Sequence, residues 1–199
     1  MVDDVDISKL GLHKLRTQMS VIPQTPILFN GCTIRENLDP FSMYDDETIR
    51  QALKDVQMIH AVENLSGQLD FIVAEGGSNF SVGQRQLLCL ARAILRKNQI
   101  LVLDEPTANV DSRTDELLQE AVSKSFPSAT VIAIAHRLDT VIEYDKILVL
   151  GRGQVLEYGA PHELLQLDGH FKSMVNDTGD VMSAELHRRA SIAYANKLY

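Results

Sequence analysis

Two adjacent carboxylates, Asp104 and Glu105, directly follow an uninterrupted apolar run over residues 100–103. The run consists of leucine and β-branched residues, which predicts a short strand buried on both faces, as in a parallel sheet. At the carboxyl end of such a strand, one carboxylate can hold Mg²⁺ on a phosphate while its neighbour orients or deprotonates a water. A polar strand end followed by a turn is the simpler alternative, and these residues alone leave it open.

A second candidate site begins at Ser81. Ser81 and Gln84 have the spacing of a capping box, which predicts a helix that runs to about Arg96. The first turn of a helix has unpaired N–H groups and the positive end of the helix dipole, and both favour an anion such as phosphate. Gly83 weakens the helix but lets its backbone come close to a ligand. The alternative is that Ser81 is only a helix cap.

The elements that must position these residues alternate between strands and helices, which predicts βαβ units and a parallel sheet. The predicted strands are 18–22, 100–103, 130–135 and 147–150, with an edge strand at 154–158 after a tight turn. The predicted helices are 33–38 (capped by Thr33), 45–58, 59–65, 81–96, 112–125 (capped by Ser112), 138–143 and one beginning at 162. From residue 168 the hydrophobic pattern weakens, which predicts a tail that is partly helical from about Asp180.

Composition narrows the possible functions. The 199 residues are enough for one ordinary domain, and the formal net charge of −8 argues against nucleic acid as a partner. Cys32 and Cys89 are too few for a disulfide framework or a zinc site. No apolar run approaches the roughly 20 residues that span a bilayer, and the acidic N-terminus has no signal-peptide pattern.

Five segments follow one another along the chain: Gln24, Phe80-Ser-Val-Gly-Gln-Arg-Gln86, Leu101-Val-Leu-Asp-Glu-Pro-Thr-Ala108, Asn109-Val-Asp111 and His136. At these spacings they resemble the nucleotide-binding domain of ATP-binding cassette (ABC) transporters. The resemblance covers residues 1 to about 167 and is greatest to the second nucleotide-binding domain of subfamily C, the multidrug-resistance-associated group. Phe80 in place of the usual leucine is a mild departure. The motifs are a Q-loop at Gln24, a signature motif at Phe80-Ser-Val-Gly-Gln-Arg-Gln86, a Walker B motif at Leu101-Val-Leu-Asp-Glu-Pro-Thr-Ala108, a D-loop at Asn109-Val-Asp111 and a switch histidine at His136.

The resemblance implies ATP and Mg²⁺ as cofactors and a role for each motif. Asp104 would hold Mg²⁺, and Gln24 would sense the metal and the attacking water. Glu105 would be the catalytic base or water-orienting residue, and His136 would hydrogen-bond the γ-phosphate. Two alternatives stay open: Gln24 as a loop amide that caps backbone groups, and His136 as a structural histidine at the end of a buried strand. The residues implied to bind ATP are Ser81, Val82, Gly83, Gln84, Gln24 and Asp111.

The implied fold is an α/β, RecA-like P-loop NTPase core with a mostly parallel sheet and an inserted helical subdomain. Residues 1–24 would form the N-terminal part of the core, and 25–96 the helical subdomain with the signature motif. Residues 97–167 would complete the core with Walker B, the D-loop and the switch histidine, and 168–199 would be a C-terminal tail. The insertion would separate the first strand from the others.

The phosphate loop, G-x-x-x-x-G-K-[ST], is not found, because no Gly-Lys dipeptide occurs in the 199 residues. In the family this loop, the first strands of the sheet and the aromatic residue that stacks on adenine lie upstream of the segment that residues 1–16 resemble. The resemblance therefore predicts a cassette that is truncated before the phosphate loop, lacks the first strands and is inactive by itself.

The function implied by the resemblance is ATP binding and hydrolysis that drives export across a membrane. The chain would lie at the cytosolic face as part of a transporter, with the transmembrane domains and another nucleotide-binding domain as partners. Two alternatives remain: a non-hydrolytic truncated cassette that lends its signature motif to a partner cassette, and a soluble cassette ATPase unrelated to transport. The sequence does not name the transported substrate.

Overall fold

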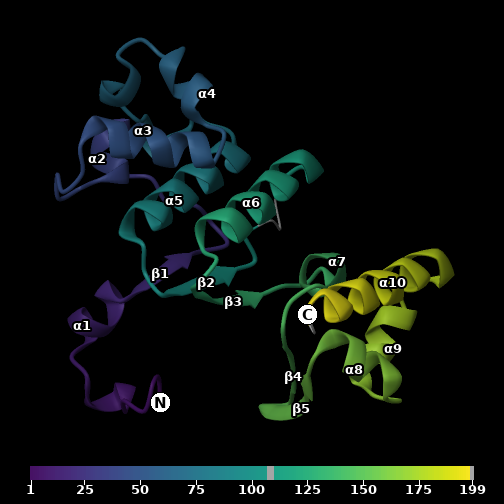
Figure 1. The fold of residues 1–199 in the computed structure, drawn as a ribbon. Helices are drawn as coiled ribbons and strands as arrows, with labels where there is room; N and C mark the ends of the chain where they lie inside the picture. Colours follow the sequence, from purple (N-terminus) through teal and green to yellow (C-terminus); the bar gives the residue numbers. More distant parts are fainter. Residues whose placement is uncertain (107–109, 198–199) are drawn as a thin grey trace. The chain divides into compact units, whose positions relative to one another are not determined.

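The computed structural model describes residues 1–106 and 110–197. The chain forms two compact units, residues 1–134 and residues 135–199, which we call the first unit and the second unit (Figure 1).

A three-stranded parallel sheet organises the first unit. Its strands are β1 (Met19–Ile22), β2 (Ile100–Asp104) and β3 (Thr130–Ile134), in the order β1-β2-β3. In the register, Ile22 lies opposite Leu103, and Asp104 lies opposite Ile134. The strands therefore end at one edge of the sheet. The predicted α/β fold is confirmed: β1 pairs directly with β2, although the helical block separates them in the sequence.

Two helices, α5 (Val82–Arg96) and α6 (Ser112–Ser125), pack on one face of this sheet (Figure 1). Every second residue of the strands points toward these helices and packs against their buried leucines. Of these strand residues, Leu101 is 0% and Leu103 is 3% exposed. The core between the helices and the sheet includes Ile22, Leu101 and Leu103 from the strands and Leu87, Leu90 and Leu118 from the helices.

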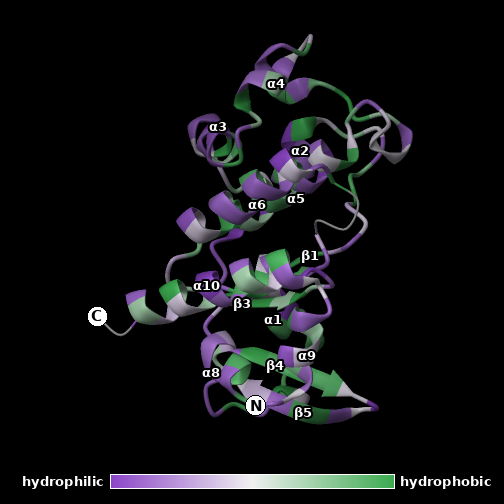
Figure 2. Cartoon of the chain, turned by 90° about the vertical axis from the view of Figure 1, so that its right-hand side faces the viewer, coloured by the Kyte–Doolittle hydropathy of each residue, from purple (hydrophilic) through white to green (hydrophobic). Residues whose placement is uncertain are grey.

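The predicted burial of 100–103 on both faces is wrong. Ile100 and Val102, which alternate with the core residues, are only half-buried. On β3 the contrast is larger, because Ile132 is 49% and Ile134 is 52% exposed. Successive strand residues point to opposite faces, and among the described residues the helices cover only one of them. Figure 2 shows the hydrophobic strands below α5 and α6.

The helical block lies between β1 and β2 and contains α2 (Ile34–Leu38), α3 (Asp46–Asp55) and α4 (Ile59–Glu63). The predicted cap at Thr33 is present, because Thr33 Oγ1 accepts from the Glu36 N–H at 3.1 Å and Glu36 Oε2 accepts from the Thr33 N–H at 2.7 Å. Helix α3 ends earlier than predicted, since Gln57 has a φ of +56°. The remaining described helices of the first unit are α1 (Leu12–Thr17) and the 3₁₀ turns Ile7–Lys9, Gln68–Asp70 and Glu75–Gly77.

The second unit contains a β-hairpin and four helices among its described residues. The hairpin strands β4 (Ile147–Gly151) and β5 (Gln154–Gly159) pair antiparallel, so the predicted strand 147–150 does not extend the parallel sheet. The two residues between them, Arg152 and Gly153, have φ values of +49° and +75°. Positive φ at both central residues is typical of a tight hairpin turn. The helices are α7 (Leu138–Val141), α8 (Pro161–Gln166), α9 (His170–Asn176) and α10 (Asp180–Asn196).

The second unit has its own core, and residues after 168 supply much of it. Phe171 is 1% exposed, and Val175 and Leu186 are 0% exposed. These side chains pack with Ile142, Leu164, Leu165 and Ala190. The sequence predicted α10 from Asp180 but did not predict α9. The hydrophobic pattern is weak because α10 buries only Leu186 and Ala190 among its described residues.

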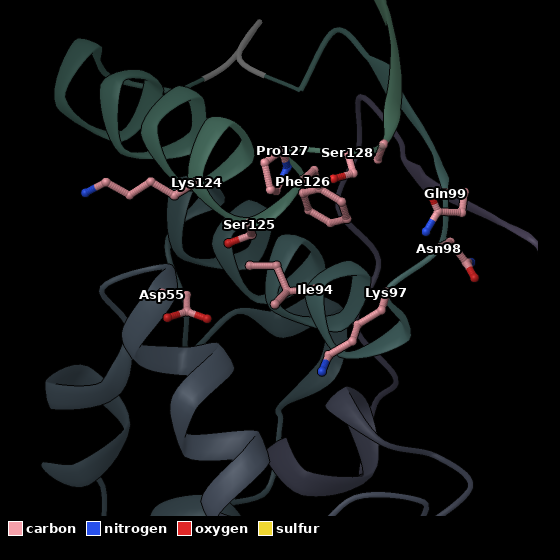
Figure 3. A pocket seen from close by; sticks show the side chains of 11 residues that line it. Asp55, Ile94, Lys97, Asn98, Gln99, Lys124, Ser125, Phe126, Pro127 and Ser128 are labelled. Atoms are coloured by element: carbon pink, nitrogen blue, oxygen red, sulfur yellow. The ribbon is translucent and has the colours of Figure 1, made fainter.

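A cavity of about 410 Å³ lies in the first unit, at the amino ends of β2 and β3 (Figure 3). Its lining includes Gln99, which directly precedes β2, and Ala129, which directly precedes β3. Asp104 and Glu105 lie at the opposite, carboxyl end of β2, so this cavity is separate from the site that they suggest. None of the helices within 1–106 and 110–197 combines the length and apolar character needed to cross a bilayer.

Candidate functional site

The carboxyl edge of the parallel sheet brings Gln24 and Glu105 together. Gln24 lies two residues after β1, and Glu105 follows the last residue of β2. Gln24 Nε2 donates to Glu105 Oε2 at 2.9 Å, across 81 residues of sequence. This contact follows from the parallel pairing, because adjacent parallel strands place their next residues at the same edge. Two residues from separate sequence motifs thus form one polar cluster.

The backbone at Glu105 has an unusual conformation. Its φ is +45°, a region that non-glycine residues seldom occupy. Its N–H donates to the carbonyl of Ile134 at 2.9 Å, which ties the residue after β2 to the end of β3. Residues in such conformations persist only where their surroundings hold them, and they are concentrated at functional sites.

Asp104, at the end of β2, is exposed, and Glu105 is half-buried. Two carboxylates and the Gln24 amide oxygen are the hard oxygen donors that Mg²⁺ prefers. Within the part of the chain that the structure describes, no group of three or more His, Cys, Asp or Glu side chains could hold a metal. Mg²⁺ is usually bound through one or two carboxylates and takes its remaining ligands from water and substrate phosphates.

The start of α5 has the capping box that the sequence predicted. Ser81 Oγ accepts from the Gln84 N–H at 3.1 Å, and Gln84 Oε1 accepts from the Ser81 N–H at 2.9 Å. The intervening N–H groups of Val82 and Gly83 have no acceptor within a regular helix. An N-terminus in this state can receive an anion.

Gly83 also has a packing role, which the sequence did not show. A Cβ at this position would lie 2.8 Å from Thr114 Cγ2 and 3.0 Å from Thr114 Oγ1. Thr114 is in the first turn of α6, so the absence of a side chain on Gly83 allows α5 and α6 to approach closely. The glycine is required by helix packing whether or not a ligand approaches it.

Asp111, and not Ser112 as the sequence predicted, is the N-cap of α6. Asp111 has extended backbone angles, φ −70° and ψ 160°, whereas Ser112 is already helical. Its carboxylate accepts from the Thr114 N–H at 3.0 Å and from Thr114 Oγ1 at 2.8 Å. These bonds, the backbone one first, lower the pKa of the Asp111 carboxyl. Thr114 therefore connects Asp111 to Gly83. The preceding D-loop residue Asn109 lies outside the described residues.

His136 belongs to the second unit and is exposed. The sequence placed it at the end of a buried strand, which is wrong: β3 ends at Ile134, and its residues are exposed or half-buried. Its contact with a γ-phosphate stays a prediction.

One buried polar residue at this site was missed by sequence reasoning. Gln86 is 1% exposed, and its Nε2 donates to the carbonyls of Pro23 and Pro106 at 3.0 and 2.8 Å. The available signal was a polar side chain inside the predicted apolar face of α5, because fully buried polar residues require internal partners.

Replacing Gly83 by alanine tests the contact between α5 and α6. We expect Gly83→Ala to lower the free energy of unfolding by about 1–2 kcal/mol, because the overpacking cost of roughly 1–3 kcal/mol outweighs the helix-propensity gain of up to about 1 kcal/mol. Denaturant unfolding of the chain measures the change.

Thr114→Ala provides the matched control for this prediction. Removing the Thr114 side chain opens the space that the new methyl group would fill, so Gly83→Ala should cost less in the Thr114→Ala background than in the native one. Equal costs in the two backgrounds would show that Thr114 does not constrain residue 83.

Comparison with known protein families matches residues 1–108 to the family described as ABC transporter. The chain belongs to this family. It is 51% identical over 199 residues to human ATP-binding cassette sub-family C member 4, which covers 100% of the chain. It is 50% identical over 181 residues to the probable multidrug resistance-associated protein lethal(2)03659 of Drosophila melanogaster, and 50% identical over 179 residues to human ATP-binding cassette sub-family C member 2.

The chain spans 15% of the length of the human member 4 protein and 12–13% of the other two relatives. These matches identify the chain as an ABC transporter nucleotide-binding domain of subfamily C. The resemblance inferred from the motifs is confirmed at that level.

Proposed function

We propose that this chain is part of a nucleotide-binding domain that binds ATP with Mg²⁺ and, in a complete site, hydrolyses it to drive export across a membrane. The contact between Gln24 and Glu105 is the observation that carries this proposal. It unites two of the predicted catalytic and metal-sensing residues at the edge of the sheet where α/β proteins bind ligands.

Each residue at this edge has a task suited to its position. Asp104 would hold Mg²⁺, which neutralises charge on the phosphates when bound. Glu105 would orient or deprotonate the attacking water, and the amide of Gln24 would hold the Glu105 carboxylate toward it. The resemblance also assigns His136, a residue of the second unit, a hydrogen bond to the γ-phosphate. Among the described residues of the first unit, the sheet edge supports the tasks of Asp104, Glu105 and Gln24 directly.

The N-terminal ends of α5 and α6 would serve a second nucleotide. Their first turns meet at Gly83 and Thr114, and their caps are Ser81 and Asp111. We propose that the N–H groups of Val82 and Gly83, with Ser81 and Gln84, face the γ-phosphate of ATP held by another nucleotide-binding domain. Asp111 would lie near the interface between the two domains. Ser81, the cap of α5, is exposed, Val82 is half-buried and Gly83 is buried, so a phosphate would approach this helix N-terminus from the Ser81 side.

The whole assembly would include transmembrane domains and act at the cytosolic face of a membrane, with this chain as part of a second cassette. The division into a core at 1–24 and 97–167, a helical subdomain at 25–96 and a C-terminal segment at 168–199 is part of this proposal.

A second candidate function is a non-hydrolytic cassette that lends its signature motif to a partner. The observation that favours the lending role is the complete capping box at Ser81, which leaves the N–H groups of Val82 and Gly83 without acceptors inside the helix. A soluble cassette ATPase unrelated to transport has no specific observation in its favour.

Association with an intact cassette tests the shared part of both candidates. We expect the native chain to bind a purified, intact nucleotide-binding domain of a subfamily C transporter in millimolar Mg-ATP. Ser81→Arg should weaken this binding by at least about tenfold, because the larger side chain fills the anion site and removes the cap. Sedimentation or light scattering measures the complex.

Ser66→Arg is the matched control, since Ser66 is an exposed residue of the first unit outside the proposed interface. It should leave the association unchanged. Equal binding by the native chain and Ser81→Arg, or no binding by either, would refute the role of Ser81 at a second nucleotide.

A further inference from the structure

Gln86 connects the helix that carries the signature motif to the edge of the sheet that carries Gln24 and Glu105. It lies on α5 two residues after Gln84, and it is among the largest fully buried side chains of the chain. Its Nε2 donates to three backbone carbonyls, those of Pro23 at 3.0 Å, Gln24 at 3.4 Å and Pro106 at 2.8 Å. These acceptors are 63, 62 and 20 residues away in sequence.

The orientation of the Gln86 amide follows from its surroundings. Carbonyl oxygens can only accept hydrogen bonds, so the group that faces three of them must be the NH₂ end. Two hydrogens serve the three acceptors, which means that one hydrogen is shared. Gln86 Oε1 is buried and has no hydrogen-bond partner among the described residues. The NH₂ end therefore provides all of the polar contacts that this side chain makes there.

One of the three acceptors belongs to Gln24 itself, and the other two are on residues next to the proposed catalytic pair. Pro23 precedes Gln24, and Pro106 follows Glu105. Gln86 thus binds the backbone on both sides of the hydrogen bond between Gln24 Nε2 and Glu105 Oε2. The φ of +45° at Glu105 is a conformation that persists only where the surrounding structure holds it. The bond from the Glu105 N–H to Ile134 holds this backbone on one side, and the bond from Gln86 to the carbonyl of Pro106 holds the next residue.

We infer that Gln86 is a positioning residue that keeps Gln24 and Glu105 in contact and transmits movements of the start of α5 to them. This inference rests on the proposed function in one respect, which is that the pair positioned by Gln86 acts on nucleotide. Helix α5 is continuous from Val82 to Arg96, so a phosphate that shifts its first turn also shifts Gln86. A phosphate bound at the first turn of α5 would then alter the contact between Gln24 and Glu105.

Amide hydrogen exchange of the full 199-residue chain tests the inference without requiring activity. The Glu105 amide is suited to this, because it donates to Ile134 at the point that Gln86 supports. In Gln86→Met, which keeps the length of the side chain and removes its donors, this amide should exchange about tenfold faster relative to the Val122 amide in the core of α6. The side-chain ¹⁵N signal of Gln24, identified by its loss in Gln24→Ala, should shift at the same time.

Leu88→Ala is the matched control, since Leu88 is 2% exposed on the same helix and makes only apolar contacts with the core. It lowers overall stability, so all protected amides should exchange faster while the Glu105 to Val122 ratio and the Gln24 signal stay close to native. Gln86→Asn gives a milder change if Gln86→Met does not fold. Its amide is shorter by one methylene, and it should raise the ratio to a smaller extent.

An unchanged exchange ratio and Gln24 signal in the folded Gln86 variant would overturn the inference, and so would equal changes in Leu88→Ala. Failure of the proposed function would give a different pair of results. The native chain would not associate with an intact cassette in Mg-ATP, while the Glu105 to Val122 exchange ratio would still rise in Gln86→Met.

Discussion

The purified 199-residue chain is expected to hydrolyse no ATP above background. Its sequence has no Gly-Lys dipeptide, and in the family the loop that contains one surrounds the phosphates of the nucleotide. Charge-assisted hydrogen bonds of this kind contribute roughly 1.5–3 kcal/mol each. Loss of two or three of them lowers turnover by at least about 10²-fold relative to a complete site.

A coupled assay of phosphate release in millimolar Mg-ATP measures this, with Glu105→Gln as the control. The substitution keeps the size of the side chain and removes the carboxylate, so any genuine turnover at this site would fall in the variant. Equal background rates in both proteins are the expected result. Mg²⁺-dependent turnover that Glu105→Gln abolishes would show that the chain completes its own site.

Truncating Phe171 is expected to destabilise the second unit by about 3–5 kcal/mol, the usual cost of replacing a buried phenylalanine by alanine. Phe171 is 1% exposed, and it packs with Val175 and Leu186, which joins α9 to α10. Hydrogen exchange of the amides in α10 measures the effect, because the helix should lose its protection when its packing partner is removed.

Val181→Ala is the control for this prediction. Val181 is also on α10 but is 88% exposed, so its replacement should change stability by no more than about 0.5 kcal/mol. Native protection of α10 in Phe171→Ala would contradict the prediction, because it would show that packing against Phe171 does not stabilise this helix.

Local signals determined much of this protein from sequence alone. The capping boxes at Thr33 and Ser81 could be predicted because a capping side chain and its partner are only three residues apart. The strands β1, β2 and β3 could be predicted from short runs with strand-type composition. The ordered motifs from Gln24 to His136 led to the family, which the comparisons confirm. Even the shared edge of Gln24 and Glu105 follows from parallel strands, which end on the same side.

Contacts between distant segments were decided only by the tertiary structure. The sequence explained Gly83 by ligand approach, but its neighbour Thr114 lies on another helix. The cap of α6 moved from Ser112 to Asp111 because the backbone turns into the helix one residue earlier than the spacing suggested. The role of Gln86 could not be predicted from its motif. Its three acceptors come close to it only when β1 pairs with β2 and α5 packs against both strands.

The residues after 168 show most clearly the difference between what the sequence predicts and what tertiary packing decides. The start of α10 at Asp180 could be predicted, whereas α9 and the burial of Phe171 could not. A helix that buries one or two side chains leaves little periodic signal in its sequence. Its stability comes instead from packing against other helices, which no local pattern records. The sequence by itself thus determined the motifs, most of the elements and the family, and the tertiary packing decided which side chains meet at the site and how the C-terminal segment folds.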